Sequence, residues 1–282
     1  MNLCNESELR ELLARHGFHF SKSKGQNFLV RDWVPQRIAE AAGVDDAFVL
    51  EVGPGVGTLT VQLCRRAAAV CSVEVDRSLT PLLAETLGEF SNVEVLFDDI
   101  LNTDIPAVVA ARAGGRRAVA CANLPYYITT DVLTRLLSCG CFADVTVMIQ
   151  KEVAQRICAR AGTAAYGAFS VFCRYWADAE LCFDVPPDCF LPRPKVTSTV
   201  VRFRLRGVPP CPIDDSDFFF RVVRASFSQR RKTLVNGLAS GLGIGKEQIA
   251  GALAQLSLRP DVRGETLELE QFAALANLLR RG

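Results

Sequence analysis

The sequence predicts an α/β protein in which a doubly wound, mostly parallel sheet is followed by a small C-terminal helical domain. From about residue 47 onward, apolar runs of strand length alternate with helical stretches. Strands that are buried on both faces of a parallel sheet have this continuous apolar character. A glycine-rich turn, E-V-G-P-G-V-G, follows the first apolar run at 51–57, and three prolines within 206–212 precede a purely helical pattern. Strands that alternate with helices are typical of a parallel sheet covered on both faces.

The predicted elements follow one another in a regular order. Each strand is an apolar or alternating run, and a helical stretch separates it from the next. The predicted strands lie at 47–52, 69–75, 93–97, 118–122, 145–149, 179–185 and 198–205. The helices predicted between the first five strands lie near 57–66, 78–89, 103–112 and 130–138.

The prolines at 206–212 mark a linker, because proline breaks both helices and strands. They divide the chain into a sheet domain at 1–208 and a helical domain at 209–282. The helices of the second domain are predicted near 215–225, 229–240, 246–254 and 268–280.

The composition argues against several classes of protein. The net charge is +1, and no apolar run approaches the roughly 18 residues of a membrane-spanning helix. Residues 1–20 carry acids and no apolar segment, so no signal peptide is predicted. The 11 cysteines are odd in number and form no C-x-x-C pair, and there are two histidines. We therefore predict a cytoplasmic protein with free thiols and no metal site.

Glycines and acids at the ends of the first three predicted strands indicate a nucleoside-binding site. Gly53 and Gly55 allow a sharp turn and a close approach to a ligand, at the edge where doubly wound sheets bind their ligands. Glu74 ends the second strand and is placed to accept hydrogen bonds from a ribose diol. Asp99, favoured over Asp98, ends the third strand and can accept a hydrogen bond from an adenine amino group. These residues do not distinguish a nicotinamide from S-adenosylmethionine.

The motif N-L-P-Y-Y at 123–127 follows the fourth strand and favours methyl transfer to an adenine amine. This amine is a poor nucleophile, because its lone pair is delocalised into the ring. Acceptors for both amino hydrogens favour a pyramidal nitrogen, and the Asn123 side-chain oxygen and a backbone carbonyl near Leu124 or Pro125 are suitable. Pro125 also fixes the loop, and Tyr126 offers an aromatic face on which a flipped base can stack.

In this order, E-V-G-P-G-V-G, S-V-E-V-D and N-L-P-Y-Y resemble the adenine dimethyltransferases of small-subunit ribosomal RNA, the KsgA family. K-S-K-G-Q-N-F-L at 22–29 resembles the N-terminal signature of that family. F-L-P-R-P-K-V-T-S-T-V at 190–200 resembles its substrate-loop motif, and F-S-Q-R-R-K-T-L-V-N-G-L at 227–238 its helical-domain signature. The resemblance extends over residues 20–240.

The resemblance implies a Rossmann-like S-adenosylmethionine-dependent methyltransferase sheet with S-adenosylmethionine as cofactor. It implies dimethylation of two adjacent adenosines near the 3′ end of small-subunit rRNA, with a role in subunit biogenesis. The expected partner is this rRNA within a partly assembled 30S subunit, and the enzyme is expected to act as a monomer.

The same resemblance implies roles for individual residues at the cofactor site. Asn27 and Leu29 would line the site through the N-terminal segment. Gly53 would contact the methionine part of the cofactor, Glu74 would hold the ribose, and Asp99 the adenine.

On the target side, the resemblance implies that Asn123 contacts both the cofactor region and the target amine. Tyr126 and Phe190 would enclose the target adenine. The chain departs from the family pattern at two positions. Tyr127 stands where some members have an asparagine, and Arg193 stands where many have a small residue or proline.

Basic side chains gather in three parts of the sequence and predict contacts to RNA phosphates. Ordinary solvated surface is the alternative for each group. Because alternate residues of an extended segment share a face, Arg202 and Arg204 of the last predicted strand and Arg206 directly after it lie on one side. The first group is Lys22 and Lys24, the second is Arg193, Lys195, Arg202, Arg204 and Arg206, and the third is Arg221, Arg224, Arg230, Arg231 and Lys232. The third group lies in the helical domain, for which we therefore predict an RNA-binding role.

Three other functions share part of this pattern. Large-subunit rRNA adenine methyltransferases share the sheet motifs, but the 190–200 and 227–238 segments favour the small-subunit group. An NAD-dependent dehydrogenase shares the glycines and the acid but has no need of N-L-P-Y. A ribosome-assembly factor with little catalysis shares the RNA surface, and the intact Asn123, Pro125 and Tyr126 argue against it.

Overall fold

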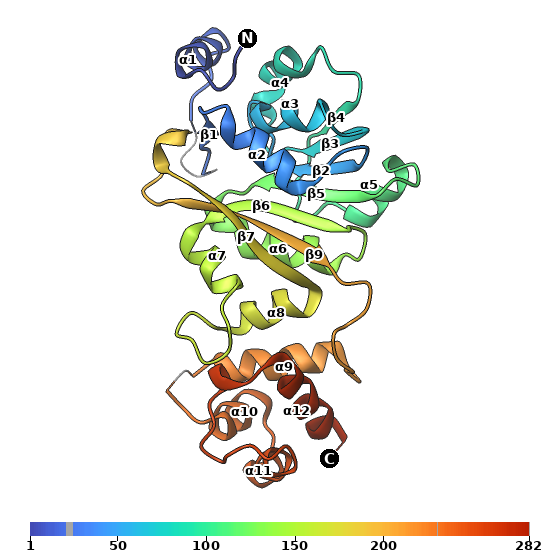
Figure 1. Cartoon of the computed structure of the whole chain (residues 1–282), viewed down its shortest axis with the longest axis vertical. Coiled ribbons are helices and arrows are strands. Elements are labelled where there is room, and N and C mark those ends of the chain that lie inside the picture. Colours follow the sequence, from blue (N-terminus) through green and yellow to red (C-terminus); the bar gives the residue numbers. More distant parts are fainter. Residues whose placement is uncertain (21–24, 230, 282) are drawn as a thin grey trace. The chain divides into compact units, whose positions relative to one another are not determined.

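In the computed structural model, which describes residues 1–20, 25–229 and 231–281, seven strands form one sheet in the order β4-β3-β2-β5-β6-β9-β7 (Figure 1). The pairs from β4 to β6 are parallel, and β9 runs antiparallel to β6. The predicted doubly wound α/β sheet is therefore confirmed. Its strands are β2 (Phe48–Val52), β3 (Ala69–Val73), β4 (Val93–Leu96), β5 (Ala118–Asn123), β6 (Asp144–Gln150), β7 (Ala177–Val185) and β9 (Ser198–Leu205).

Helices pack on both faces of the central strands, because these strands are apolar and buried along most of their length. One buried cluster joins Val49, Cys121 and Met148 of three neighbouring strands to apolar residues of two helices. All five residues of β2 are buried, so its opposite face is covered as well. The helices that accompany these strands are α2 (Trp33–Ala42), α3 (Thr58–Cys64), α4 (Thr80–Leu87), α5 (Ile105–Arg112), α6 (Thr129–Ser138) and α7 (Lys151–Ile157).

The N-terminal segment contains elements that the sequence patterns did not predict. Helix α1 (Glu6–Arg15) begins after Asn5, whose side-chain oxygen accepts hydrogen bonds from the first turn. Strand β1 (Phe28–Leu29) pairs antiparallel with β8 (Phe190–Leu191) in a separate two-stranded sheet. This pairing places Leu29 opposite Phe190, although the two residues are far apart in the sequence.

Five helices of the described residues enclose a second core. Phe219 and Phe272 are fully buried in it, and the Tyr166 hydroxyl donates to the Leu267 carbonyl at 3.0 Å. The helix predicted near 229–240 begins at Leu234, because the side chain of Thr233 caps its first turn. The helices are α8 (Ala168–Trp176), α9 (Ser216–Phe227), α10 (Leu234–Leu242), α11 (Lys246–Gln255) and α12 (Leu269–Arg281).

The chain divides into two compact units, and it enters each of them twice. The sheet unit comprises Met1–Ala154 and Glu180–Leu205, and the helical unit comprises Gln155–Ala179 and Arg206–Gly282. This division differs from the single boundary predicted at 208/209, because Gln155–Ala179 belongs to the helical unit. The physical reason is that apolar residues of α8 pack in the same core as those of α9 and α12.

Candidate active site

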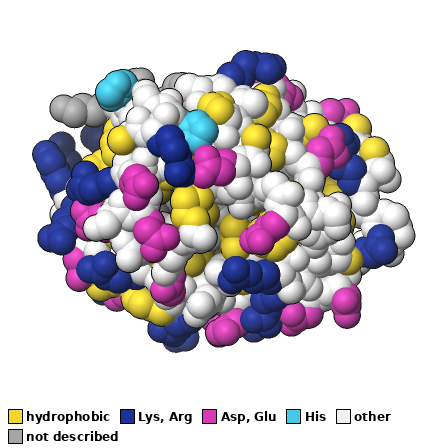
Figure 2. Space-filling view, turned by 90° about the horizontal axis from the view of Figure 1, so that it is seen from above, with side chains coloured by type: hydrophobic (Ala, Val, Ile, Leu, Met, Phe, Trp, Pro, Cys, Tyr) yellow, Lys and Arg dark blue, Asp and Glu magenta, His cyan; other side chains and the backbone are white. Residues whose placement is uncertain are grey.

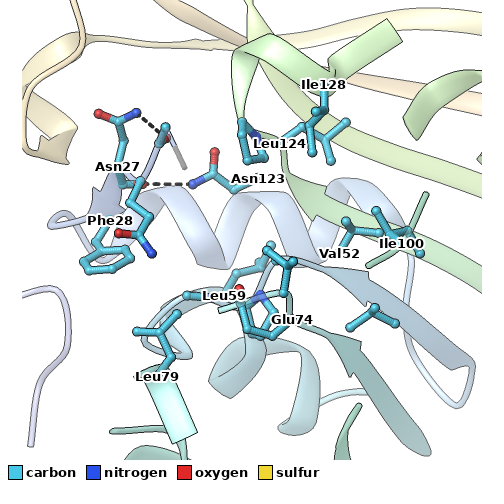
Figure 3. A pocket seen from close by; sticks show the side chains of 18 of the residues that line it. Asn27, Phe28, Val52, Leu59, Glu74, Leu79, Ile100, Asn123, Leu124 and Ile128 are labelled. Carbon is cyan, nitrogen blue, oxygen red and sulfur yellow. Dashed lines mark hydrogen bonds between the residues drawn. The ribbon is translucent and has the colours of Figure 1, made fainter. Parts of the chain in front are cut away.

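A cavity of about 260 Å³ lies in the sheet unit, at the carboxyl ends of β2, β3 and β5 (Figure 3). Parallel strands bring the loops that follow them to one edge of the sheet, where ligands of doubly wound folds bind. The cavity brings together all the residues predicted for the cofactor and the target base. These are Asn27, Leu29, Gly53, Gly55, Glu74, Asp99, Asn123, Pro125, Tyr126 and Phe190.

The glycine turn after β2 leaves room at the floor of the cavity. Gly53 and Gly55 have φ angles of 70° and 60°, which favour glycine. A Cβ atom on Gly55 would lie 3.0 Å from the Phe28 ring, whereas a Cβ on Gly53 would meet no heavy atom within 4 Å. The backbone is therefore packed against β1 at Gly55 and open at Gly53.

Glu74 is held rigidly at the end of β3. Its side chain is 5% exposed, and its two carboxylate oxygens accept hydrogen bonds from the Gly55 and Asp76 backbone N–H groups at 3.3 and 2.8 Å. Burial raises the pKa of Glu74 above its usual range. Each oxygen of a carboxylate can accept a second hydrogen bond, so the side chain retains acceptor capacity toward the cavity.

Two acids follow β4 with different surroundings. Asp99 is half-buried, and its carboxylate accepts hydrogen bonds from the Leu101 N–H and the Asn102 side chain at 2.9 and 3.2 Å. Asp98 is exposed and accepts a hydrogen bond from the Thr103 hydroxyl at 2.9 Å. Both line the cavity, and the preference for Asp99 as the adenine contact stays a prediction.

The side chain of Asn123, at the end of β5, has a defined orientation. Its Nδ2 atom donates to the Asn27 backbone carbonyl at 3.2 Å, as Figure 3 shows. No described residue donates a hydrogen bond to Oδ1 of Asn123, so this oxygen keeps its full acceptor capacity. The contact with Asn27 thus selects the rotamer that offers an acceptor at the catalytic loop.

The structure also distinguishes the two backbone carbonyls that the sequence left open. The Pro125 carbonyl accepts hydrogen bonds from the Ile128 N–H at 3.3 Å and the Thr129 hydroxyl at 3.2 Å, at the start of α6. The Leu124 N–H donates to the Met148 carbonyl, whereas no described residue donates to the Leu124 carbonyl. Leu124 is therefore the better candidate for the second acceptor.

The two aromatic residues predicted around the target base differ in accessibility. Tyr126 is half-buried, and its hydroxyl lies 2.8 Å from the Ser198 hydroxyl of β9. Burial raises the pKa of this phenol, so the ring stays neutral at physiological pH. Phe190 is only 2% exposed and packs in the core cluster of the central strands, although it also lines the cavity.

Sequence reasoning missed one residue that lines the cavity, Gln26, and one buried acid directly before the glycine turn, Glu51. The Gln26 side chain donates to the Asp76 carboxylate at 2.7 Å and connects the N-terminal segment to the loop after β3. Gln26 lies within the K-G-Q-N-F-L motif, which could have identified it. Glu51, beneath the glycine turn, is 1% exposed and accepts hydrogen bonds from the Thr60 and Ser72 hydroxyls at 2.7 Å each.

Glu51 is expected to make stability depend on pH. Burial raises its pKa from 4.5 to about 7. A raised folded-state pKa means that this contribution to stability is complete below pH 4.5 and is lost as the pH rises through 7. We expect a loss of about 3 kcal/mol of unfolding free energy between these limits, measured by denaturant unfolding from pH 5 to pH 8. Glu51→Gln should remove this dependence, and an equal slope in both proteins would contradict the assignment.

The predicted basic groups have three different outcomes. Lys22, Lys24 and Arg230 lie outside the described residues. The arginines of β9 and the residue after it are paired with acids: Arg202 with Asp144, Arg204 with Glu180, and Arg206 with Asp178. That face is therefore largely neutralised. The remaining predicted cations are exposed: Arg193 and Lys195 in the sheet unit and Arg221, Arg224, Arg231 and Lys232 in the helical unit.

Figure 2 shows both signs of charge interspersed over the face in view, with Lys and Arg more numerous at its left edge. Among the described residues, no helix is both long and apolar enough to cross a membrane. In the same residues, no group of three or more His, Cys, Asp and Glu side chains is arranged to hold a metal ion.

Sequence comparisons identify the family. A family model for ribosomal RNA adenine dimethylase matches residues 17–280. The chain is 44% identical to ribosomal RNA small subunit methyltransferase A of Geobacillus thermodenitrificans, over 99% of this chain and 97% of that protein. It is 43% identical to the protein of the same name from Streptococcus pneumoniae, over 99% of both chains.

Solved structures show the same fold. The 23S rRNA methyltransferase ErmE is 26% identical with a TM-score of 0.69, over 90% of this chain and 99% of that one. A dimethyladenosine transferase from Plasmodium falciparum has a TM-score of 0.71 at 23% identity, over 88% and 95% of the two chains. The family match over nearly the whole chain and the identity to these relatives agree with the motifs around the cavity. The chain belongs to the ribosomal RNA adenine dimethylase family.

Proposed function

We propose that this protein is an S-adenosylmethionine-dependent methyltransferase that dimethylates two adjacent adenosines near the 3′ end of small-subunit rRNA. The observation that carries the proposal is the position of two acceptors around one cavity. The buried carboxylate of Glu74 lies at the end of β3, and the Asn123 amide oxygen lies at the end of β5. The near full-length similarity to proteins named small subunit methyltransferase A supports the choice of substrate.

The residues present fit a nucleoside cofactor with an amino-acid tail. Glu74 would accept hydrogen bonds from the ribose diol, and Asp99 one from the adenine amino group. The space without heavy atoms at Gly53 would accept the methionine part, and Asn27 and Leu29 would close the site from the N-terminal side. S-adenosylmethionine supplies an electrophilic methyl group, which Glu74 and Gly53 would hold beside the catalytic loop.

On the target side, the chain's own groups would orient the amine. Asn123 Oδ1 and the Leu124 carbonyl would each accept one amino hydrogen, which favours a pyramidal nitrogen whose lone pair faces the methyl donor. Tyr126 would stack on the adenine, with Phe190 below it. Because Asn123 is already oriented by its bond to Asn27, little reorganisation is needed at the moment of reaction.

Methylation of defined substrates tests this function. We expect the protein to transfer labelled methyl groups to undermethylated small subunits, and mapping of the modified nucleotides should locate dimethyladenosine near the 3′ end of the rRNA. Large subunits from a strain without the corresponding modification serve as the comparison. Transfer to large subunits alone would contradict the proposal and favour the activity named for ErmE.

We further propose that the enzyme acts in the cytoplasm as a monomer on a partly assembled 30S subunit. The exposed cations would supply phosphate contacts that position the RNA without reading its sequence. Arg221 and Arg224 of α9 line one shallow hollow together with Ser228. Arg193 and Lys195 follow β8 in the sheet unit, with Lys22, Lys24, Arg230, Arg231 and Lys232 as the other proposed contacts.

Reversing two of these charges should weaken RNA binding. For the double variant Arg221→Glu and Arg224→Glu we expect about a tenfold or greater loss of RNA affinity at moderate salt. The slope of log affinity against log salt should fall by about 2, because two phosphate contacts are lost. Filter binding across a salt series measures both, and calorimetry with the cofactor should show no change.

The matched control is the double variant Lys246→Glu and Arg263→Glu, which reverses two exposed charges elsewhere in the helical unit. It should leave the salt slope almost unchanged. If both double variants bind RNA alike, the α9 arginines are ordinary solvated surface.

A further inference from the structure

The mouth of the cavity has two chemically different sides. Of the described residues that line it, three are exposed: Val75, Asp98 and Tyr127. Val75 and Asp98 follow β3 and β4, on the side of Glu74 and Asp99. Tyr127 lies on the opposite side, on the short 3-10 helix Tyr126–Ile128 that follows the catalytic loop. Asp98 places a carboxylate on one side of the mouth, whereas Tyr127 offers an uncharged aromatic surface on the other, which is the better support for a nucleobase.

The Tyr127 ring is unusually accessible for a large side chain. It is 61% exposed, whereas the neighbouring Tyr126 is half-buried and tethered through its hydroxyl to Ser198. The N-terminal segment supports one edge of the ring, since a Cβ atom on Gly25 would lie 3.4 Å from Cδ1 and Cε1 of Tyr127. The ring is therefore positioned by its backbone and by Gly25, while most of its surface stays open to solvent.

We propose that Tyr127 is the platform of a second nucleobase subsite, on which the base of a nucleotide adjacent to the methylated adenosine stacks. The inference rests on the proposed function, because it takes the target to be an adenosine within an RNA strand. A target base that leaves its stack exposes the faces of its neighbours. An aromatic ring at the rim can replace this lost stacking, and it accepts any base because every base has a π-face.

The position of Tyr127 next to Tyr126 in the chain supports this assignment. Consecutive residues carry the two rings, and both rings line one cavity. A target base held at Tyr126 would therefore place a flanking nucleotide within the proposed subsite at Tyr127. Nothing else exposed on this side of the cavity mouth is aromatic among the described lining residues. The subsite would give a role to Tyr127, which stands where some family members have an asparagine.

A thermodynamic cycle between the ring and the flanking base tests the subsite. RNA affinity is measured for the wild type and Tyr127→Ala, each with an intact substrate and with substrates that are abasic on the 5′ or the 3′ side of the target. Relative to the wild type with intact RNA, Tyr127→Ala with intact RNA should bind about 5- to 100-fold more weakly. The wild type should lose a similar factor with the RNA that is abasic on one of the two sides. Tyr127→Ala with that abasic RNA should lose no more RNA affinity than either change alone. Tyr127→Phe, which keeps the aromatic ring, should bind RNA as tightly as the wild type.

Two controls distinguish base stacking on Tyr127 from a purely structural role of its ring, and a third measurement tests the proposed function. Trp33→Ala removes an exposed aromatic outside the cavity and should not alter RNA affinity. The cofactor affinity of Tyr127→Ala should stay within about twofold of the wild type, whereas a structural role through Gly25 would weaken cofactor binding. Wild-type methyl transfer is measured in the same series.

The outcomes are distinct. If the wild type transfers no methyl group to any RNA, the proposed function fails and the subsite fails with it. If the wild type is active but the effects of Tyr127→Ala and of both abasic substitutions add independently, the subsite alone is overturned. Non-additive effects on one side, with cofactor affinity retained, identify the stacked nucleotide.

Discussion

Asn123→Ala is expected to lower the single-turnover rate of methyl transfer by about 100- to 1,000-fold, or roughly 3–4 kcal/mol. The target amine has two hydrogens, and the proposed mechanism needs an acceptor for each. The Leu124 carbonyl remains in the variant, but alanine cannot replace Oδ1 of Asn123. Single-turnover rates at saturating cofactor and RNA separate this chemical effect from binding.

The binding steps should respond much less in this variant. Most RNA affinity is expected from phosphate contacts away from the cavity, whereas some cofactor affinity is lost because the bond to Asn27 is removed. Asn277→Ala is the matched control, since its amide also donates to a backbone carbonyl, that of Pro212, in the helical unit. If Asn123→Ala reacts within a few-fold of the wild type, Asn123 only structures the loop and the proposed mechanism is wrong.

Glu74→Ala is expected to weaken cofactor affinity by about 100-fold or more. A hydrogen bond to a charged group contributes about 1.5–3 kcal/mol, and a ribose diol offers two. The carboxylate is already fixed by the Gly55 and Asp76 N–H groups, so no ordering cost reduces this contribution. Calorimetric titration with S-adenosylmethionine and with its demethylated product measures the loss, and RNA affinity should change little.

The pH dependence of cofactor binding supplies a second readout for the same residue. Because burial raises the pKa of Glu74, its charged form is lost at a higher pH than that of an exposed glutamate. Affinity should therefore fall as the pH is lowered through this raised pKa, and the dependence should be absent in Glu74→Ala. Glu94→Ala, which removes an exposed acid from the next strand, is the matched control. Unchanged affinity in folded Glu74→Ala would show that the ribose lies elsewhere.

Local patterns were sufficient to predict the strands that position the site. Continuous apolar runs such as F-V-L-E-V form strands buried on both faces. The parallel order then brings Gly53, Glu74 and Asn123 to one edge, because parallel strands end on the same side of a sheet. The motifs predicted the site residues because each motif lies directly after a strand. It can therefore be identified from neighbouring residues in the sequence, without knowledge of long-range contacts.

The ion pairing of the predicted cations was less well predicted, because the sequence does not reveal which acid lies beside a given arginine. Arg202 and Arg204 alternate with apolar residues as expected, yet each lies against an acid from a neighbouring strand. A cross-strand partner depends on which strands are adjacent, and that adjacency is a property of the whole sheet. By contrast, Arg221 and Arg224 are exposed on one helix, where spacing along the sequence does report the shared face.

The sequence alone therefore determined the α/β class, the order along the chain of the seven strands of the main sheet, and the residue types around the cavity. Only the tertiary structure decided how distant segments meet. The β1–β8 pairing sets Leu29 against Phe190, the Asn27 carbonyl orients Asn123, and α8 joins the helical unit instead of the sheet unit. Periodicity and motifs describe neighbours along the chain, whereas these three arrangements depend on contacts between residues that are far apart in it.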